Sequence, residues 1–330
     1  MLHASIGRRR FLKASGAAAA AAIFPTRAFA AYPERPIRLV VPFSPGGATD
    51  VAARLWAERA KDILGTVIVD NRGGGGGLIG ANEVLRSPAD GYTILFGNTS
   101  TQVLIPIISE KAPYDSLKDF QAIYLMCNSP TSIVVNSSVP VKNLQELIAY
   151  LKKNHAKMSY GSAGAGTLTN LAGELFKQLI GLKDLTHIPY KGAAPGVTDL
   201  AAGHIPMMTP NVGRPLLALH QEGRVRILAI NADKRLAAAP DIPTSAEAGL
   251  KGMIAANFNG LFARADVPKE IIARLGEVSQ QVGADPAVQK ALIKSGFEPI
   301  TDSGPDMAQK AIAEEIERWT PVVKAANFSK

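Results

Sequence analysis

Short apolar runs alternate along the chain with longer segments in which apolar residues recur at helical spacing. Residues 37–41 form the first apolar run, which predicts a buried strand, and residues 49–64 form the first amphipathic segment, which predicts a helix. The same pattern predicts further strands at 66–69, 93–96, 132–135, 158–160 and 225–229, and further helices at 144–153, 168–179, 268–282, 286–295 and 306–326. This alternation predicts an α/β fold with a largely parallel sheet.

The first thirty residues have a different pattern, which is typical of a twin-arginine signal peptide. They contain a twin-arginine motif at 8–13, an apolar run at 17–24 and a small-residue cleavage site at 28–30. The apolar run is shorter than the roughly 20 residues that cross a bilayer. We therefore expect residues 1–30 to be cleaved after export to the periplasm. The alternative interpretation is a buried amphipathic helix.

The predicted signal peptide changes the charge of the chain. The whole chain has 36 basic and 28 acidic residues and a net charge of +8, but five basic residues and no acid lie within residues 1–30. Their removal leaves 31 basic and 28 acidic residues, a net charge of +3. This small excess argues against a nucleic-acid partner. No later stretch of eighteen apolar residues occurs, so we expect a soluble mature protein.

Length and residue types set further limits. About 300 mature residues exceed what a single core holds comfortably, so we expect two domains. Cys127 is the only cysteine, which excludes an intrachain disulfide, and its apolar neighbours predict a buried thiol. The five histidines show no metal-ligand spacing. We expect neither a metal site nor a cofactor.

Three loops that follow predicted strands carry glycines, hydroxyls and amides. Glycines before a helix let backbone N–H groups converge on an anion, and the helix N-terminus adds partial positive charge. The alternative for the first loop is an ordinary tight turn with Thr49 or Asp50 as N-cap. We expect Asp50 to hold its loop, because a carboxylate beside a bound carboxylate costs energy. The candidate ligand-binding residues are Ser44, Gly46, Gly47, Ala48, Thr49 and Asp50 in the first loop, Asn98, Thr99 and Ser100 in another, and Ser162, Ala163, Gly164, Gly166, Thr167 and Asn170 in a third.

Signatures of enzymes are weak, and we expect no catalytic residues. Residues 75–80 match GxGxxG formally, but the five glycines at 73–77 satisfy that pattern almost by accident. Such a run has a large ordering cost, which is usually explained by a close approach to another backbone or to a ligand. Residues 161–164 lack the spacing of a nucleophile elbow, so Ser162 is interpreted as a neutral donor. Glu314, Glu315 and Glu317 are interpreted as a solvated helix face.

A set of short motifs covers nearly the whole of residues 31–330, and their combination is specific. They are Tyr32-Pro33 with Pro36-Ile37-Arg38; Pro42-Phe43 with Pro45-Gly46-Gly47, Asp50 and Arg54; Val69-Asp70-Asn71-Arg72 with Gly75, Gly77 and Ile79-Gly80; Asp90-Gly91-Tyr92-Thr93; Pro189-Tyr190-Lys191-Gly192; Asp199-Leu200 with Gly203; and Pro243-Thr244 with Glu247-Ala248-Gly249. In this combination the chain resembles the substrate-binding proteins of tripartite tricarboxylate transporters, called the Bug or TctC family.

The resemblance implies a type II periplasmic-binding-protein fold, with two α/β lobes that close on a ligand like a hinge. Lobe I would comprise residues 31–132 and 258–330, and lobe II residues 133–257. The resemblance also implies that the two glycine loops face each other across the cleft and contact ligand carboxylates through backbone amides and ordered water. The residues carried over by matching position are Ser44, Gly46, Gly47, Thr49 and Asp50, and Ser162, Gly164, Gly166 and Thr167.

The chain departs from the family pattern near the expected cleft. Asn170 stands where a histidine is common, Phe258 where a tryptophan is expected, and Arg264 where a proline is common. The first two departures indicate an unusual ligand, and the third is expected to affect the hinge or the surface.

The resemblance implies a monomeric periplasmic receptor that delivers a small carboxylate to the membrane permease subunits of such a transporter. Two alternatives stay open: a ligand-sensing subunit of a membrane signalling system, and an exported enzyme that uses the same cleft. The scarcity of basic residues in the loops argues mildly against a tricarboxylate. Monocarboxylates, dicarboxylates, aromatic acids and amino acids all fit.

Overall fold

The computed structural model describes residues 32–109, 111–182 and 184–325. The chain divides into two units after Glu34, and every element below belongs to the second unit. The predicted signal peptide, including its twin-arginine motif and cleavage site, lies outside the described residues. Among the described helices, none combines the length and apolar character that a bilayer crossing requires.

The first of two sheets has six strands in the order β11-β4-β10-β3-β1-β2. Strands β2 and β3 pair with β1 in parallel, whereas β10 pairs antiparallel with both β3 and β4, and β4 pairs antiparallel with β11. The strands are β1 (Ile37–Val41), β2 (Val67–Asn71), β3 (Thr93–Asn98), β4 (Phe120–Pro130), β10 (Ala256–Arg264) and β11 (Glu298–Pro299).

The second sheet has five strands in the order β7-β6-β8-β5-β9. Strands β7 and β8 pair with β6 in parallel, and β8 and β9 pair antiparallel with β5. The strands are β5 (Ser132–Asn136), β6 (Ser159–Ser162), β7 (Thr186–Pro189), β8 (Met207–Met208) and β9 (Val225–Ile230).

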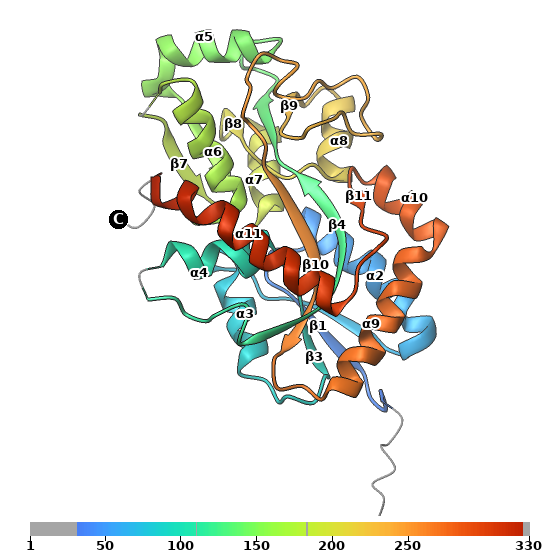
Figure 1. Cartoon of the computed structure of the whole chain (residues 1–330). Coiled ribbons are helices and arrows are strands. Elements are labelled where there is room, and N and C mark those ends of the chain that lie inside the picture. Colours follow the sequence, from blue (N-terminus) through green and yellow to red (C-terminus); the bar gives the residue numbers. More distant parts are fainter. Residues whose placement is uncertain (1–31, 110, 183, 326–330) are drawn as a thin grey trace, which may run out of the picture. The chain divides into compact units, whose positions relative to one another are not determined.

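Both sheets are mixed, so the prediction of a largely parallel sheet was wrong. In the first sheet the cause is the pair of long strands β4 and β10, which run antiparallel to each other, so that one leaves the sheet while the other returns. In the second sheet, β5 runs antiparallel to both β8 and β9. After β4, the chain enters the second sheet at β5, and it returns to the first sheet at β10 (Figure 1). The predicted lobe boundaries lie at these crossings, and their exact positions stay predictions.

The helices follow the predicted segments closely where periodicity is strong. Helix α6 and strand β1 have the predicted limits, and helices α2, α5, α9, α10 and α11 differ by one or two residues within the described range. The helices are α2 (Ala48–Leu64), α3 (Leu78–Leu85), α4 (Ile105–Ile108), α5 (Leu144–Asn154), α6 (Leu168–Leu179), α7 (Ala193–Ala202), α8 (Arg214–Gln221), α9 (Lys269–Ala284), α10 (Pro286–Lys294) and α11 (Pro305–Ala325), with short helical turns η1 (Gly75–Gly77), η2 (Ser100–Leu104) and η3 (His155–Lys157).

Helices from both ends of the sequence cover the first sheet. Trp56 of α2 is fully buried and its indole Nε1 donates a hydrogen bond to Ser279 Oγ of α9 over 3.2 Å. Helices α9 and α11 both pack on β4, and α11 lies across β4 and β10 in Figure 1. One apolar core continues from this sheet into the second through the crossing strands, where Leu125, Ile133 and Phe258 are all buried.

Cys127 lies within that core, as its apolar neighbours predicted. The side chain is completely buried, and burial raises the pKa of its thiol well above the ordinary value. A thiol in this environment stays protonated and is a poor nucleophile.

Candidate functional site

The first glycine loop connects β1 to α2 and is held by the carboxylate of Asp50. Asp50 is 2 % exposed and accepts hydrogen bonds from Gly46 N at 2.8 Å, Asn71 Nδ2 at 2.9 Å and Arg54 Nε at 3.0 Å. The N-cap of α2 is Gly47 without a side-chain cap, so the alternative of Thr49 or Asp50 as N-cap was wrong. Asp50 instead holds its own loop, as we expected from its charge.

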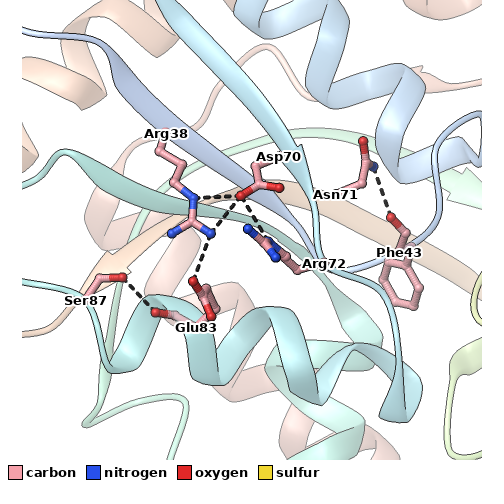
Figure 2. A network of polar contacts seen from close by, with 7 residues as sticks. All are labelled: Arg38, Phe43, Asp70, Asn71, Arg72, Glu83 and Ser87. Carbon is pink, nitrogen blue, oxygen red and sulfur yellow. Dashed lines mark hydrogen bonds and ion pairs between the residues drawn. The ribbon is translucent and has the colours of Figure 1, made fainter.

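A polar network behind this loop ties β1, β2 and α3 together (Figure 2). Arg38 Nε donates to Asp70 at 2.7 Å, Arg38 Nη2 donates to Glu83 at 2.8 Å, and Arg72 Nε donates to Asp70 at 3.1 Å. Burial alone would raise the pKa of Asp70, but the hydrogen bonds from both arginines outweigh it and lower that pKa. The network fixes the end of β2, from which the glycine run leaves.

Asn71 connects this network to the loop. Its Nδ2 donates to the Phe43 carbonyl at 3.0 Å, as Figure 2 shows, and also to Asp50. The backbone before Gly46 is therefore anchored on both sides. Such anchoring fixes the direction of the backbone N–H groups that begin α2, which is what an anion site needs.

The second glycine loop connects β6 to α6 and is held by its own hydroxyls and amide. Thr167 is the N-cap of α6, and its Oγ1 accepts from Asn170 N at 3.3 Å. Asn170 Oδ1 accepts from Gly166 N at 3.0 Å, and Thr169 Oγ1 accepts from Ala163 N at 2.9 Å. Asn170, one of the departures from the family pattern, therefore braces the loop.

Ser162 contacts a histidine that lies 25 residues later in the sequence. Ser162 Oγ is 2.7 Å from His187 Nε2, and it also accepts from Gly164 N at 3.1 Å. The His187 ring stacks on Tyr160 with a centroid distance of 4.9 Å, and burial lowers the pKa of His187. Ser162 is fully buried, so this pair supports the loop from behind. No histidine lies near Ser162 in the sequence, and the pairing of β7 with β6 brings His187 into place.

The third predicted group, Asn98 to Ser100, forms the floor where the two sheets meet. Asn98 Nδ2 donates to Thr49 Oγ1, which donates in turn to Asn259 Oδ1, both over 3.1 Å. Thr99 Oγ1 accepts from the backbone of Phe258 at 3.0 Å. Phe258, a second departure, packs against Phe262 with a ring distance of 6.4 Å.

Loops of the two sheets touch directly. The backbone N–H of Leu168, at the start of α6, donates to Ser100 Oγ over 3.1 Å. A Cβ on Gly76 would lie 2.7 Å from the Ala165 carbonyl oxygen, and one on Gly73 would lie 2.9 Å from the carbonyl oxygen of Lys191. This close approach of one backbone to another explains Gly73 and Gly76, whereas Gly74, Gly75 and Gly77 have positive φ values that favour glycine.

A small cavity lies between these loops, and we call it the central cavity. Its volume is about 20 Å³, counted as space that the centre of a water molecule can occupy, which is room for little more than one water. None of its lining side chains is charged. It is lined by Phe43, Gly47, Ala48, Thr49, Asn98, Ser100, Ala163, Thr167, Thr169, Ala193, Asn211 and Asn257.

The central cavity gathers about half of the predicted residues. Gly47, Ala48, Thr49, Asn98, Ser100, Ala163 and Thr167 line it. The predicted residues outside the lining are Ser44, Gly46, Asp50, Thr99, Ser162, Gly164, Gly166 and Asn170, and their contact with a ligand stays a prediction.

Five lining residues were not predicted. Phe43 and Thr169 lie inside the loops that we singled out, so composition had pointed to their neighbourhood. Ala193 begins α7, Asn211 lies in a loop and Asn257 lies near the start of β10, and we had singled out none of the three for ligand binding. Only the tertiary fold brings these three residues to the cavity.

A larger hollow of about 890 Å³ lies elsewhere, along α2, β2 and the start of α8. Arg54, Lys61 and Arg214 are among the residues that line it. We place the candidate site in the smaller cavity, because α2 and α6, which follow strands of different sheets, both begin there. The described residues contain no group of three or more His, Cys, Asp or Glu side chains that could hold a metal ion.

Two mixed α/β sheets, joined by crossing strands and meeting at a polar cavity, define a two-lobed periplasmic-binding-protein fold. Solved structures agree. Periplasmic binding protein BugD superimposes with a TM-score of 0.85 at 34 % identity, over 90 % of this chain and 99 % of that one. MatC from Rhodopseudomonas palustris with bound malate superimposes with a TM-score of 0.83 at 28 % sequence identity, over 88 % of this chain and 100 % of that one. An R. palustris protein with adipate superimposes with a TM-score of 0.85 at 33 % sequence identity, over 89 % of this chain and 98 % of that one.

The sequence comparisons identify the family. Residues 52–328 match the model of the tripartite tricarboxylate transporter family receptor. The chain is 36 % identical over 324 residues to a protein encoded in the tcbD-tcbE intergenic region of Pseudomonas sp. strain P51, covering 97 % of this chain and 95 % of that protein. It is 34 % identical over 296 residues to BugT of Bordetella pertussis, covering 89 % and 90 %. The chain belongs to the tripartite tricarboxylate transporter receptor family, and the resemblance drawn from its motifs is confirmed.

Proposed function

We propose that this chain is a periplasmic receptor that binds a small carboxylate in the central cavity and delivers it to the permease subunits of a tripartite tricarboxylate transporter. One observation carries the proposal: α2 and α6, which follow strands of different sheets, both begin at the same cavity. The N-terminus of a helix has partial positive charge, so two of them favour an anion between them.

The family and its solved members support the same class of ligand. Relatives with this fold were solved with malate and with adipate, both small dicarboxylates. The lining of the cavity offers neutral hydroxyls, amides and backbone groups and no charged side chain. A site made of fixed dipoles can bind with micromolar affinity, about −8 kcal/mol, and still release its ligand to a transporter.

Binding requires movement of the two lobes. The central cavity has room for little more than one water, whereas a carboxylic acid of several carbons needs far more space. We propose that the acid enters an open form, in which the loop contacts between the sheets are broken, and that closure follows. The proposed lobes are residues 31–132 with 258–330, and residues 133–257.

The experiment is a thermal-shift screen of purified residues 31–330 against a panel of carboxylic acids, followed by calorimetry of the acids that stabilise. We expect at least one acid to raise the melting temperature. Sugars, metals and nucleotides serve as negative controls. If only these classes raised the melting temperature of the protein, the proposal would be overturned.

A pair of variants ties binding to the cavity. Ala193 lines it at the start of α7, and Ala193→Asp places a carboxylate there that repels a bound acid. Ala202→Asp adds the same charge at the exposed last residue of that helix. We expect Ala193→Asp to abolish binding and Ala202→Asp to keep it. Delivery is tested separately, by uptake into cells that express the permease subunits with and without the receptor.

A further inference from the structure

Asn211 and Asn257 form a chain of hydrogen bonds at the lining of the central cavity. Asn211 Nδ2 donates to the carbonyl oxygen of Ser129 over 2.8 Å, and Asn257 Nδ2 donates to Asn211 Oδ1 over 2.8 Å. Both asparagines line the cavity. Asn257 is 3 % exposed, and its Oδ1 is among the few buried side-chain atoms of the described residues that have no hydrogen-bond partner.

The polarity of this chain is fixed by its first member. A backbone carbonyl can only accept, so the amide of Asn211 must turn its nitrogen toward Ser129 and its oxygen toward Asn257. Asn257 must then present its nitrogen to Asn211, which leaves its oxygen as the remaining group. A flip of either amide would place an acceptor against an acceptor, and a flip of Asn211 would also place a donor against a donor. The side-chain atom of Asn257 that has no partner is therefore its oxygen, an acceptor.

The other polar groups of the floor are already paired among themselves. The Thr49 hydroxyl accepts from Asn98 and donates to Asn259, so its hydrogen is committed. The two helix N-termini supply donors, which suit the oxygens of a carboxylate. A plain carboxylate has no hydrogen to offer to Asn257, and a buried acceptor without a donor weakens binding about 5- to 150-fold.

We propose that Asn257 recognises a neutral hydrogen-bond donor, a hydroxyl or an amide N–H, carried by the small carboxylic acid that binds in the central cavity. This inference rests on the proposed function and narrows its ligand class. The absence of charged side chains from the described lining favours a neutral donor over an ammonium group, because no carboxylate is present to balance a cation. The receptor therefore selects hydroxy acids or acids with an amide.

The test compares pairs of acids that differ only in this donor, by calorimetry on the wild-type protein. The pairs are malate with succinate, lactate with propionate, and succinamate with levulinate, in which an amide NH₂ replaces a methyl group. We expect the member with the donor to bind about 10-fold more tightly, or better, in at least one pair. This comparison needs no variant, so it does not depend on how a substitution folds.

Two variants assign the preference to Asn257. Asn257→Leu has a similar volume and no acceptor, and we expect the difference within a pair to fall below about 3-fold. Asn154→Leu, at the end of α5 and outside the lining, should keep the wild-type difference. Circular dichroism and the melting temperature verify that both variants fold.

The outcomes separate this inference from the proposed function. Equal affinities within every pair, or an unchanged preference in Asn257→Leu, would overturn the role of Asn257 while carboxylate binding stands. If no acid of any pair or of the wider panel binds, the proposed function fails, and the inference fails with it.

Discussion

Replacing Gly76 by alanine adds one methyl group at the point where loops of the two sheets meet. Gly76 lies in η1 with φ 65° and ψ 13°, and its new Cβ would stand 2.7 Å from the carbonyl oxygen of Ala165 in the second glycine loop. An ordinary contact begins at 3.4 Å, so the two loops must separate by about 0.7 Å. The open form that we propose lacks this contact, so it would accept the methyl group freely.

The size of the effect follows from the cost of overpacking, which is about 1–3 kcal/mol. If only the closed form binds tightly, the same energy appears as a loss of affinity of about 5- to 150-fold. Alanine also has a cost of about 1 kcal/mol in the left-handed region, whatever its neighbours. That second cost must be separated from the first.

Gly203 provides the control. It caps α7 with φ 82° and ψ 9°, and the atoms nearest to a new Cβ belong to the Asn136 side chain at 3.8 Å, an ordinary distance. Gly203→Ala therefore carries the left-handed cost without the clash. We expect the free energy of unfolding to fall in both variants, and ligand affinity to fall only in Gly76→Ala.

The assays are calorimetry with an acid found in the screen and small-angle X-ray scattering without ligand. We expect a weaker dissociation constant and a larger radius of gyration for Gly76→Ala than for Gly203→Ala. If the two variants agree within about 2-fold in affinity and have the same radius, closure does not depend on this contact, and the reasoning is refuted.

Three further predictions concern single residues. Asp50→Ala leaves the Gly46 N–H without its acceptor and should lower the free energy of unfolding, measured in urea, by about 2–4 kcal/mol. The control Asp62→Ala, at an exposed ion pair, should change it by no more than about 1 kcal/mol. Equal losses in the two variants would contradict the role of Asp50. Burial lowers the pKa of His187 below its ordinary 6.5, so the unfolded chain binds an extra proton and the stability of the fold falls as the pH drops below about 6.5. His187→Gln should lose less stability between pH 7 and 5 than the wild type. An unchanged dependence of stability on pH would argue against this role of His187. Cys127 should resist a thiol reagent at pH 8 until urea unfolds the protein, and rapid labelling of the native state would show that it is accessible.

Local periodicity predicted most long elements, because a buried helix face or a buried strand leaves a repeating signal. The limits of β1 and α6 agree with the structure to the residue. Periodicity did not predict the long crossing strands β4 and β10, although their residues are mostly buried. Strands covered on both faces lose the polar alternation that identifies a strand, and β10 carries Asn257 and Asn259 within its apolar run.

The candidate site shows the same division. Glycine and hydroxyl residues at strand ends pointed to the loops that now line the central cavity, since their chemistry is local. Asn211 and Asn257 are 46 residues apart and meet through the return of β10 to the first sheet. Likewise, His187 reaches Ser162 only because β7 pairs with β6 in parallel. Contacts of this kind depend on strand pairing between distant segments, which no local pattern encodes.

The two helix N-termini also explain why an acid should close the molecule. In the closed form, α2 and α6 bring two partial positive charges to one cavity that contains no charged side chain. Their mutual repulsion opposes closure when the cavity holds only water. An acid between them replaces that repulsion with attraction to both lobes, and it does so only in the closed form, where both helix ends can reach it. This differential interaction would shift the population from the proposed open form to the closed one, and Gly73 and Gly76 permit the shift because they add no side chain where the two backbones meet.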